Sequence, residues 1–232
     1  MLGTDEFERQ MDFFAHRQKA GGPGTRPEVT FDDGHISNYQ LALPILQARG
    51  MRARFFITVG WTGHKPGYMG WGELRSLHAA GQEIGAHGWS HTLLTHCDNN
   101  ALKTELGKAR LTLEDKLSRR ITTMSLPGGR YNDRVIAACL ESGYTQIYTS
   151  VPKAEADTSA TTIGRLNILK GMSLDWTTSL LEPESSALAR VGRQYRLKAA
   201  AKSLLGDRMY EKVWALVNRK DVEVDEAEAT GE

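Results

Sequence analysis

Short apolar runs that read as strands alternate with helical segments through most of this 232-residue chain. The expected strands cover Glu28–Phe31, Arg54–Val59, Glu83–Ala86, Thr122–Leu126, Gln146–Ser150 and Ile163–Leu169. The segments with helical spacing of apolar residues cover Thr4–Lys19, Tyr39–Arg49, Gly72–Ala80, Asn99–Ser118 and Asp133–Ser142. Such an alternation predicts an α/β fold built on a parallel sheet.

Three of the expected strands are followed directly by residues that can take part in a catalytic site. Phe31 is followed by Asp32-Asp33-Gly34, Ala86 by His87, and Leu126 by Pro127-Gly128-Gly129. In barrel folds of this class, the carboxyl ends of the strands carry the active site. We therefore expect these groups to meet at one edge of the sheet.

The chain changes character after Glu184. We expect residues 1–187 to form the main domain, 188–220 a basic helical extension with nine Lys or Arg residues, and 221–232 an acidic, disordered tail. The basic stretch has two interpretations: contact with an anionic membrane surface, or a solvated face that packs on the barrel or on another subunit. We favour the second, and the oligomeric state stays open.

Composition and the first residues narrow the context. The formal net charge of +1 gives no reason to expect a nucleic-acid partner. The two cysteines, Cys97 and Cys139, do not suggest a disulfide framework. Residues 1–20 carry charges throughout and lack the apolar core of a secretory signal. The expected location is cytoplasmic, although a leader removed beforehand would leave no trace.

Two short motifs indicate metal chemistry. In Asp32-Asp33-Gly34, one carboxylate can bind a cation while its neighbour moves a proton, because side chains alternate along a strand. In His87-Gly88-Trp89-Ser90-His91, two histidines four residues apart can face one metal from a single helical turn. Two histidines and one carboxylate are a common catalytic zinc set. Taken alone, Asp-Asp-Gly is also an ordinary turn.

The combination resembles the polysaccharide deacetylase family (carbohydrate esterase family 4). TFDDG, RARFFITVG, EIGAHGWSH and LPGG occur in family order over roughly residues 29–169. The resemblance implies a distorted (β/α) barrel, here with a C-terminal helical extension. It also implies Asp32 as catalytic base, with Asp33, His87 and His91 as metal ligands. The resemblance also places the backbone N–H that would hold the oxyanion in the Pro127-Gly128-Gly129 turn, with Gly128 the better candidate.

The chain departs from the family pattern at two points. The family's third motif usually has an Arg that orients the base, and here that position is Ser125. Either Arg130 or Arg165 can supply the cation instead. We favour Arg165 because a strand would hold it more rigidly. The family's late histidine, which protonates the leaving amine, is also missing, since no histidine follows His96.

The sequence therefore predicts a metal-dependent carbohydrate N-deacetylase, a hydrolase of linear amide C–N bonds. Its substrate would be an acetylated poly- or oligosaccharide of cell-surface or exopolysaccharide biosynthesis, a context that comes from the resemblance. Zn²⁺ is the expected metal, with Co²⁺, Ni²⁺ and Mn²⁺ as alternatives. The competing hypothesis is a non-catalytic carbohydrate-binding member of the fold, suggested by Ser125 and the missing histidine. Trp61, Tyr68, Trp71 and Trp89 are candidates to line a sugar groove.

Overall fold

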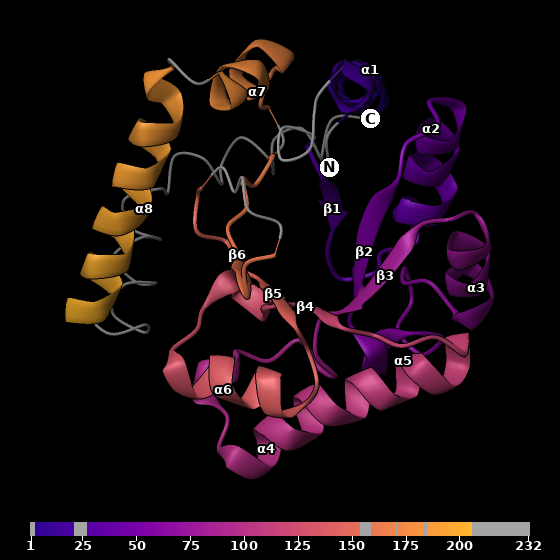
Figure 1. The fold of residues 1–232 in the computed structure, drawn as a ribbon, viewed down its shortest axis with the longest axis vertical. Coiled ribbons are helices and arrows are strands. Elements are labelled where there is room, and N and C mark those ends of the chain that lie inside the picture. Colours follow the sequence, from indigo (N-terminus) through magenta and orange to yellow (C-terminus); the bar gives the residue numbers. More distant parts are fainter. Residues whose placement is uncertain (1–2, 21–26, 154–158, 170, 183–184, 206–232) are drawn as a thin grey trace, which may run out of the picture. The chain divides into compact units, whose positions relative to one another are not determined.

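Six short strands lie side by side in the order in which they occur in the sequence, and every neighbouring pair is parallel. The computed structural model describes residues 3–20, 27–153, 159–169, 171–182 and 185–205. The strands are β1 (Val29–Phe31), β2 (Ala53–Ile57), β3 (Glu83–Ala86), β4 (Thr123–Ser125), β5 (Gln146–Tyr148) and β6 (Thr162–Ile163). Figure 1 shows the sheet curved into a half-barrel. The predicted α/β barrel-type fold is confirmed.

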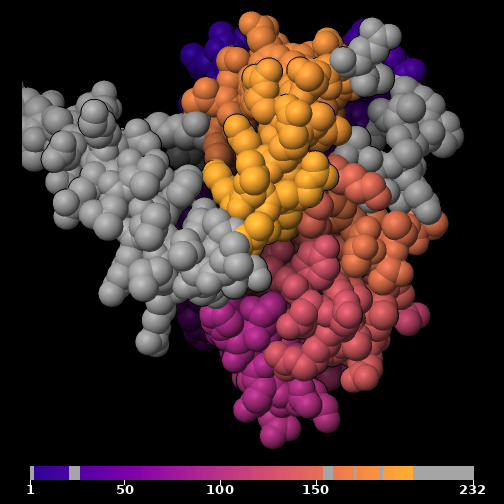
Figure 2. Space-filling model, turned by 90° about the vertical axis from the view of Figure 1, so that its left-hand side faces the viewer, coloured from indigo at the N-terminus to yellow at the C-terminus, as the bar shows by residue number. Residues whose placement is uncertain are grey.

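Helices in the connections cover the outer, convex face of this sheet (Figure 1). They are α2 (Leu43–Ala48), α3 (Trp71–Ala79), α4 (Asn99–Lys103), α5 (Ala109–Leu117) and α6 (Asp133–Glu141). Two further helices, α1 (Thr4–Ala20) before β1 and α7 (Leu174–Leu181) after β6, contact each other. Helices α3 and α5 contact each other and β3. In Figure 2, α4 and α6 (magenta to pink) present one continuous outer surface.

The two faces of the sheet differ in chemistry because side chains alternate along each strand. On β2, Phe55 and Ile57 belong to the main hydrophobic core between sheet and helices, while Phe56 belongs to a small separate cluster on the inner face. Phe31 of β1 stacks on Phe55, with ring centroids 4.8 Å apart. Thr30, between two residues that pack on the core, instead bonds the Arg165 guanidinium. The inner face therefore carries polar side chains such as Thr30 beside the small cluster of Phe56.

Two helices begin or continue through wider turns that the 3.6-residue pattern did not predict. The expected helix 39–49 begins with a π-helical turn, Asn38–Ala42, before α2. The expected helix 99–118 is α4, a π-helical turn at Thr104–Lys108, and α5. The strand expected at residues 163–169 was too long, since β6 covers Thr162–Ile163 alone.

The chain divides into two compact units, residues 1–183 and 184–232. The second contains α8 (Ser186–Leu205), on which Arg190, Arg193, Arg196 and Lys198 are exposed. Residues 206–232, which include the predicted acidic tail, lie outside the described residues, so that part of the expected organisation stays a prediction. No helix within the described ranges is long and apolar enough to cross a membrane.

Candidate active site

Asp33, His87 and His91 converge at the carboxyl ends of β1 and β3. The Asp33 Oδ1 atom lies 3.3 Å from His87 Nε2 and 3.2 Å from His91 Nε2. One ligand atom from each of the three residues lies within 4.8 Å of the others. The Asp33 Oδ1 atom is buried without a hydrogen-bond partner in the described structure. A buried carboxylate oxygen is costly unless it is bonded or coordinates a cation, so this arrangement fits a divalent metal.

The tautomer of His87 is set by a hydrogen bond to the backbone of β4. Its Nδ1 lies 2.7 Å from the backbone carbonyl oxygen of Ser125, and the side chain is almost fully buried. A carbonyl oxygen can only accept, so Nδ1 carries the proton and Nε2 keeps its lone pair. Metal-binding histidines commonly have this second contact, because it sets both tautomer and ring orientation.

His91 reaches the same point from a loop, and the predicted single helical turn is wrong. Residues 88–91 are not helical, and both Gly88 (φ 76°) and His91 (φ 63°) have left-handed backbones. For a residue with a side chain, this conformation costs roughly 1–3 kcal/mol. The His91 ring packs on His87 and on Trp61, with centroid distances of 5.0 and 5.3 Å. The tight loop brings the two imidazoles together, as a helix would, by a different geometry.

Asp33 lies in the turn after β1 and not on the strand. Its φ of 72° and the 84° of Gly34 turn the chain sharply, and the Gly34 N–H bonds the Asp32 carbonyl at 2.9 Å. Alternation along a strand was therefore the wrong reason for separating the two carboxylates. The imidazoles of His87 and His91 close to its carboxylate hold the pKa of Asp33 well below its ordinary value, and the nearby Asp33 carboxylate raises the pKa of His91.

Asp32 is held by Arg165 and Ser125. The guanidinium of Arg165 donates to Asp32 Oδ1 at 2.8 Å and to Oδ2 at 2.9 Å, a bidentate pair. The Ser125 hydroxyl donates to Asp32 Oδ2 at 3.1 Å and accepts from Arg165 at 2.7 Å. Burial alone would raise the pKa of Asp32, but these bonds and the nearby cationic charge hold the pKa below its ordinary value.

Arg165 lies two residues beyond β6, so its predicted place on a strand is wrong. Its rigidity has another source. The Arg165 N–H bonds the Val151 carbonyl at 3.0 Å, and Nε bonds the Thr149 carbonyl at 3.1 Å. The guanidinium also lies over the inner-face rings of Phe56 and Tyr148. Backbone and side chain are both anchored, and the side chain crosses the inner face from the last strand to the first.

The Pro127-Gly128-Gly129 turn lies beside the histidine loop. A Cβ on Gly88 would meet the Pro127 ring at 3.6 Å, and one on Gly128 would meet Leu93 at 2.7 Å. The N–H of Gly129 bonds the Leu126 carbonyl at 2.8 Å. Of the two glycines, Gly128 (φ 64°) is therefore the one whose N–H is the candidate to bind an oxyanion.

An aromatic rim borders His91 on the side of the loop after β2. Trp61 and Tyr68 meet edge to face at 4.7 Å, and the Lys65 ammonium lies 3.3 Å from the Trp61 ring centroid. His35 packs edge on against Tyr68, and its Nδ1 accepts the N–H of Ser37. Of the four aromatic residues predicted for a sugar groove, Trp61 and Tyr68 are those placed together at this rim. Trp71 and Trp89 pack partly against the main core.

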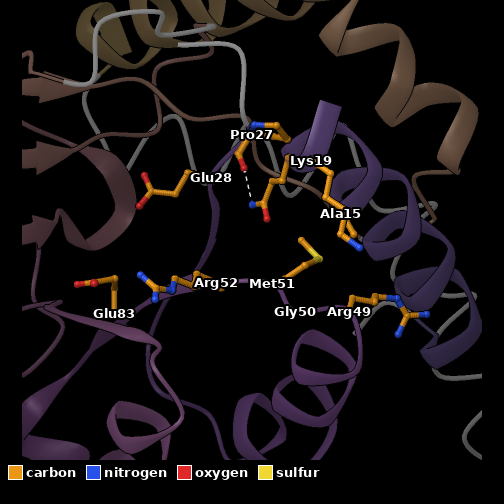
Figure 3. Close-up of a pocket in the computed structure, with 11 residues that line it drawn as sticks. Ala15, Lys19, Pro27, Glu28, Arg49, Gly50, Met51, Arg52 and Glu83 are labelled. Carbon is orange, nitrogen blue, oxygen red and sulfur yellow. Dashed lines mark hydrogen bonds between the residues drawn. The ribbon is translucent and has the colours of Figure 1, made fainter. Parts of the chain in front are cut away.

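A separate pocket of about 400 Å³ lies at the amino-terminal edge of the strands (Figure 3). Its lining includes Glu28, Arg52 and Glu83, which border β1, β2 and β3 at their first residues, and part of α1. Glu28 is bonded to Arg54 and Glu83 to Arg119. The described residues of this lining include no histidine or cysteine, so the pocket is not where the predicted chemistry gathers.

Comparison with known proteins identifies the family. Residues 22–147 match the polysaccharide deacetylase family model, which is more than half of the chain. The chain therefore belongs to the polysaccharide deacetylase family. It is 29% identical to the Bacillus subtilis protein YxkH over 146 residues, 62% of this chain and 52% of that protein. It is 28% identical to chitin deacetylase 1 of Cryptococcus neoformans over 119 residues, 51% of this chain and 24% of that protein.

The fold is also found in solved structures. The Streptococcus pyogenes deacetylase PplD, solved in complex with acetate, superimposes with a TM-score of 0.70 at 21% identity. The match covers 78% of this chain and 88% of that one. The chain spans about half the length of YxkH and a quarter of the Cryptococcus enzyme.

Proposed function

We propose that this protein is a metal-dependent N-deacetylase of acetylated poly- or oligosaccharides. The observation that carries the proposal is the pairing of two sites at one edge of the sheet. Asp33, His87 and His91 form a three-ligand set, and the adjacent Asp32 is held by a separate Arg165–Ser125 network. A metal-binding carboxylate beside an independently anchored one supplies both functions that amide hydrolysis needs. Membership of the polysaccharide deacetylase family supports the substrate class.

Asp33, His87 and His91 would hold the divalent metal, and Zn²⁺ suits two imidazoles and a carboxylate. When bound, the metal supplies Lewis-acid polarisation and a water of lowered pKa. The chain's own contribution is to keep the three ligands aimed at one point. His87 is locked by its bond to the Ser125 carbonyl, and Asp33 and His91 by their left-handed turns.

Asp32 acts as the base. A carboxylate offers about four lone-pair positions, and Arg165 and Ser125 together donate three hydrogen bonds to it. One position is left from which to accept a proton from the attacking water. The low pKa of Asp32 keeps it ionised at neutral pH and makes its protonated form a ready donor.

The lowered pKa of Asp32 also lets this residue protonate the leaving amine, the role of the family's missing late histidine. No histidine follows His96 in the chain. Asp32 takes one proton from water as the C–O bond forms, and returns it to the amine nitrogen as the C–N bond breaks. Acetic acid and the free amino sugar leave, Asp32 is ionised again, and the acid then loses its remaining proton to the amine or to solvent to give acetate. The Gly128 N–H would stabilise the oxyanion between these two events.

Acetate release from N-acetylglucosamine oligomers tests the proposal. The purified protein is stripped with a chelator, dialysed, and assayed before and after addition of Zn²⁺, Co²⁺, Ni²⁺ or Mn²⁺. Release that disappears with the chelator and returns with metal is the expected result. Glycan binding with no acetate release by metal-loaded protein would instead favour the competing hypothesis of a carbohydrate-binding member of the fold.

A further inference from the structure

Glu105 is a buried carboxylate directed at the backbone of the histidine loop. Its Oε2 accepts the N–H of Trp89 and the N–H of Ser90, each at 2.9 Å. Its Oε1 accepts the hydroxyl of Ser90 at 2.7 Å. The residue is only 7% exposed. Burying a carboxylate is expensive unless its oxygens are bonded, and these three donors all come from the two residues that precede His91.

A local irregularity in the helix places Glu105 at this position. It lies in the π-helical turn Thr104–Lys108 between α4 and α5, among the core residues Leu102, Leu106 and Ala109. Single π-helical turns inside α-helices are often found at functional sites. Three residues further along the same turn, the Lys108 ammonium lies 3.6 Å from the Trp89 ring centroid. One helical turn therefore contacts the loop at two separate points, through Glu105 and through Lys108.

The opposite side of the loop is closed by the turn after β2. The Gly60 N–H bonds the Trp89 carbonyl at 2.8 Å, and the Val59 N–H bonds the Gly88 carbonyl at 3.1 Å. A Cβ on Gly60 would lie 2.6 Å from that Trp89 oxygen. Glu105 thus accepts hydrogen bonds from the N–H groups of the loop, and the turn after β2 donates hydrogen bonds to the loop's carbonyls. The backbone before His91 therefore has little freedom.

We infer that Glu105 is a positioning residue of the metal site, which acts through Trp89 and Ser90 to hold His91 in its left-handed conformation. A left-handed histidine persists only where its surroundings determine it. Without the carboxylate, the two N–H groups lose their buried acceptor, and the loop can relax away from the metal. This inference rests on the proposed function only in taking His91 as a metal ligand.

The test compares four variants by Co²⁺ affinity, measured in competition with a chromophoric chelator, and by the absorption spectrum of the bound Co²⁺. Glu105→Ala removes the acceptor. Glu105→Asp keeps the charge but withdraws it by one methylene. Glu105→Gln can still accept both N–H groups. The matched control is Glu114→Ala on α5, because Glu114 also accepts a loop N–H, from Ile121 at 2.9 Å, away from the metal ligands.

We expect Glu105→Ala and Glu105→Asp to lose about 10- to 100-fold in Co²⁺ affinity, the range for residues that orient metal ligands, with an altered spectrum. Glu105→Gln should recover most of the affinity, and Glu114→Ala should bind like the wild type. Thermal unfolding of the metal-free proteins identifies variants that fold. If Glu105→Ala does not fold, the Co²⁺ affinity and spectrum of Glu105→Asp test the inference instead.

The inference is overturned if the folded Glu105→Ala or Glu105→Asp variant binds Co²⁺ with the wild-type affinity and spectrum, even when its unfolding temperature is lowered. That result would make Glu105 a purely structural residue. Because the readout is metal binding, a wild-type protein that binds Co²⁺ but releases no acetate contradicts the proposed function and leaves this inference standing.

Discussion

Arg165 binds both carboxylate oxygens of Asp32, at 2.8 and 2.9 Å, although 133 positions separate the two residues in the chain. The pair joins the last strand region to the first across the inner face of the half-barrel. Ser125 lies between them and bonds both. A small hydroxyl at the position where the resemblance leads one to expect an arginine leaves space for the guanidinium of Arg165, which extends across the inner face from the region after β6.

Replacing Arg165 by Met should lower kcat/KM about a hundredfold, the scale expected when a catalytic group is misplaced. The acid limb of the pH profile should also move to higher pH. The reason is that burial raises the pKa of Asp32 and Arg165 opposes it. The pH dependence of acetate release measures both effects. Arg119→Met is the matched control, because Arg119 pairs with Glu83 at the opposite edge of the sheet. An unchanged acid limb in Arg165→Met would contradict the orienting role.

Ser125→Ala should reduce activity less than Arg165→Met does, since it removes one of the three hydrogen bonds to Asp32. The double variant should lose less than the product of the two single effects. Residues of one network do not act independently, and Ser125 also bonds the guanidinium. A double-mutant cycle on kcat/KM measures the coupling. Strict additivity would mean that Ser125 and Arg165 do not act as one unit.

Asp33→Ala and His91→Ala should each reduce metal content to background after dialysis against a low concentration of Zn²⁺. Each removes one of the three proposed ligands that the described residues supply. Metal analysis of the purified variants is the measurement, with His78→Gln as control because His78 lies on α3 and bonds Arg119. Stoichiometric zinc in either ligand variant would show that the ion binds elsewhere.

The Asp32–Arg165 pair should also make stability depend on pH. The pKa of Asp32 in the folded protein lies below its ordinary value of 3.8. The ionised carboxylate therefore stabilises the fold above that ordinary value, and this contribution is lost as the pH falls through the folded-state pKa. Thermal unfolding of the metal-free wild type and Arg165→Met should differ most near neutral pH and converge in acid. A difference that stays constant down to acid pH would rule out this linkage.

Much of this site was predictable because strand ends and residue types are visible in the sequence. Asp33, His87 and His91 meet as expected, and Arg165 reaches Asp32. Their local backbone was not predictable. Left-handed φ values at Asp33 and His91 come from tertiary contacts, and no repeating pattern of residues encodes them.

The roles of two supporting residues were not predicted, for similar reasons. In the sequence, Ser125 was interpreted as the loss of the family arginine, but its hydroxyl donates a hydrogen bond to Asp32 directly. Glu105 was not singled out within the expected helix 99–118, because a π-helical turn does not follow the 3.6-residue period. Sequence periodicity finds the face of a regular helix, and it fails where one turn is widened.

The most direct test is a parallel measurement of bound metal and acetate release for the wild type and Asp32→Asn. The isosteric amide leaves Asp33, His87 and His91 unchanged, so both proteins should bind one equivalent of Zn²⁺. Asp32→Asn should release acetate from N-acetylglucosamine oligomers roughly 10²- to 10⁴-fold more slowly, the range that a general base contributes. Wild-type turnover by zinc-loaded Asp32→Asn would contradict the assignment of Asp32 as the base, and with it the proposed mechanism.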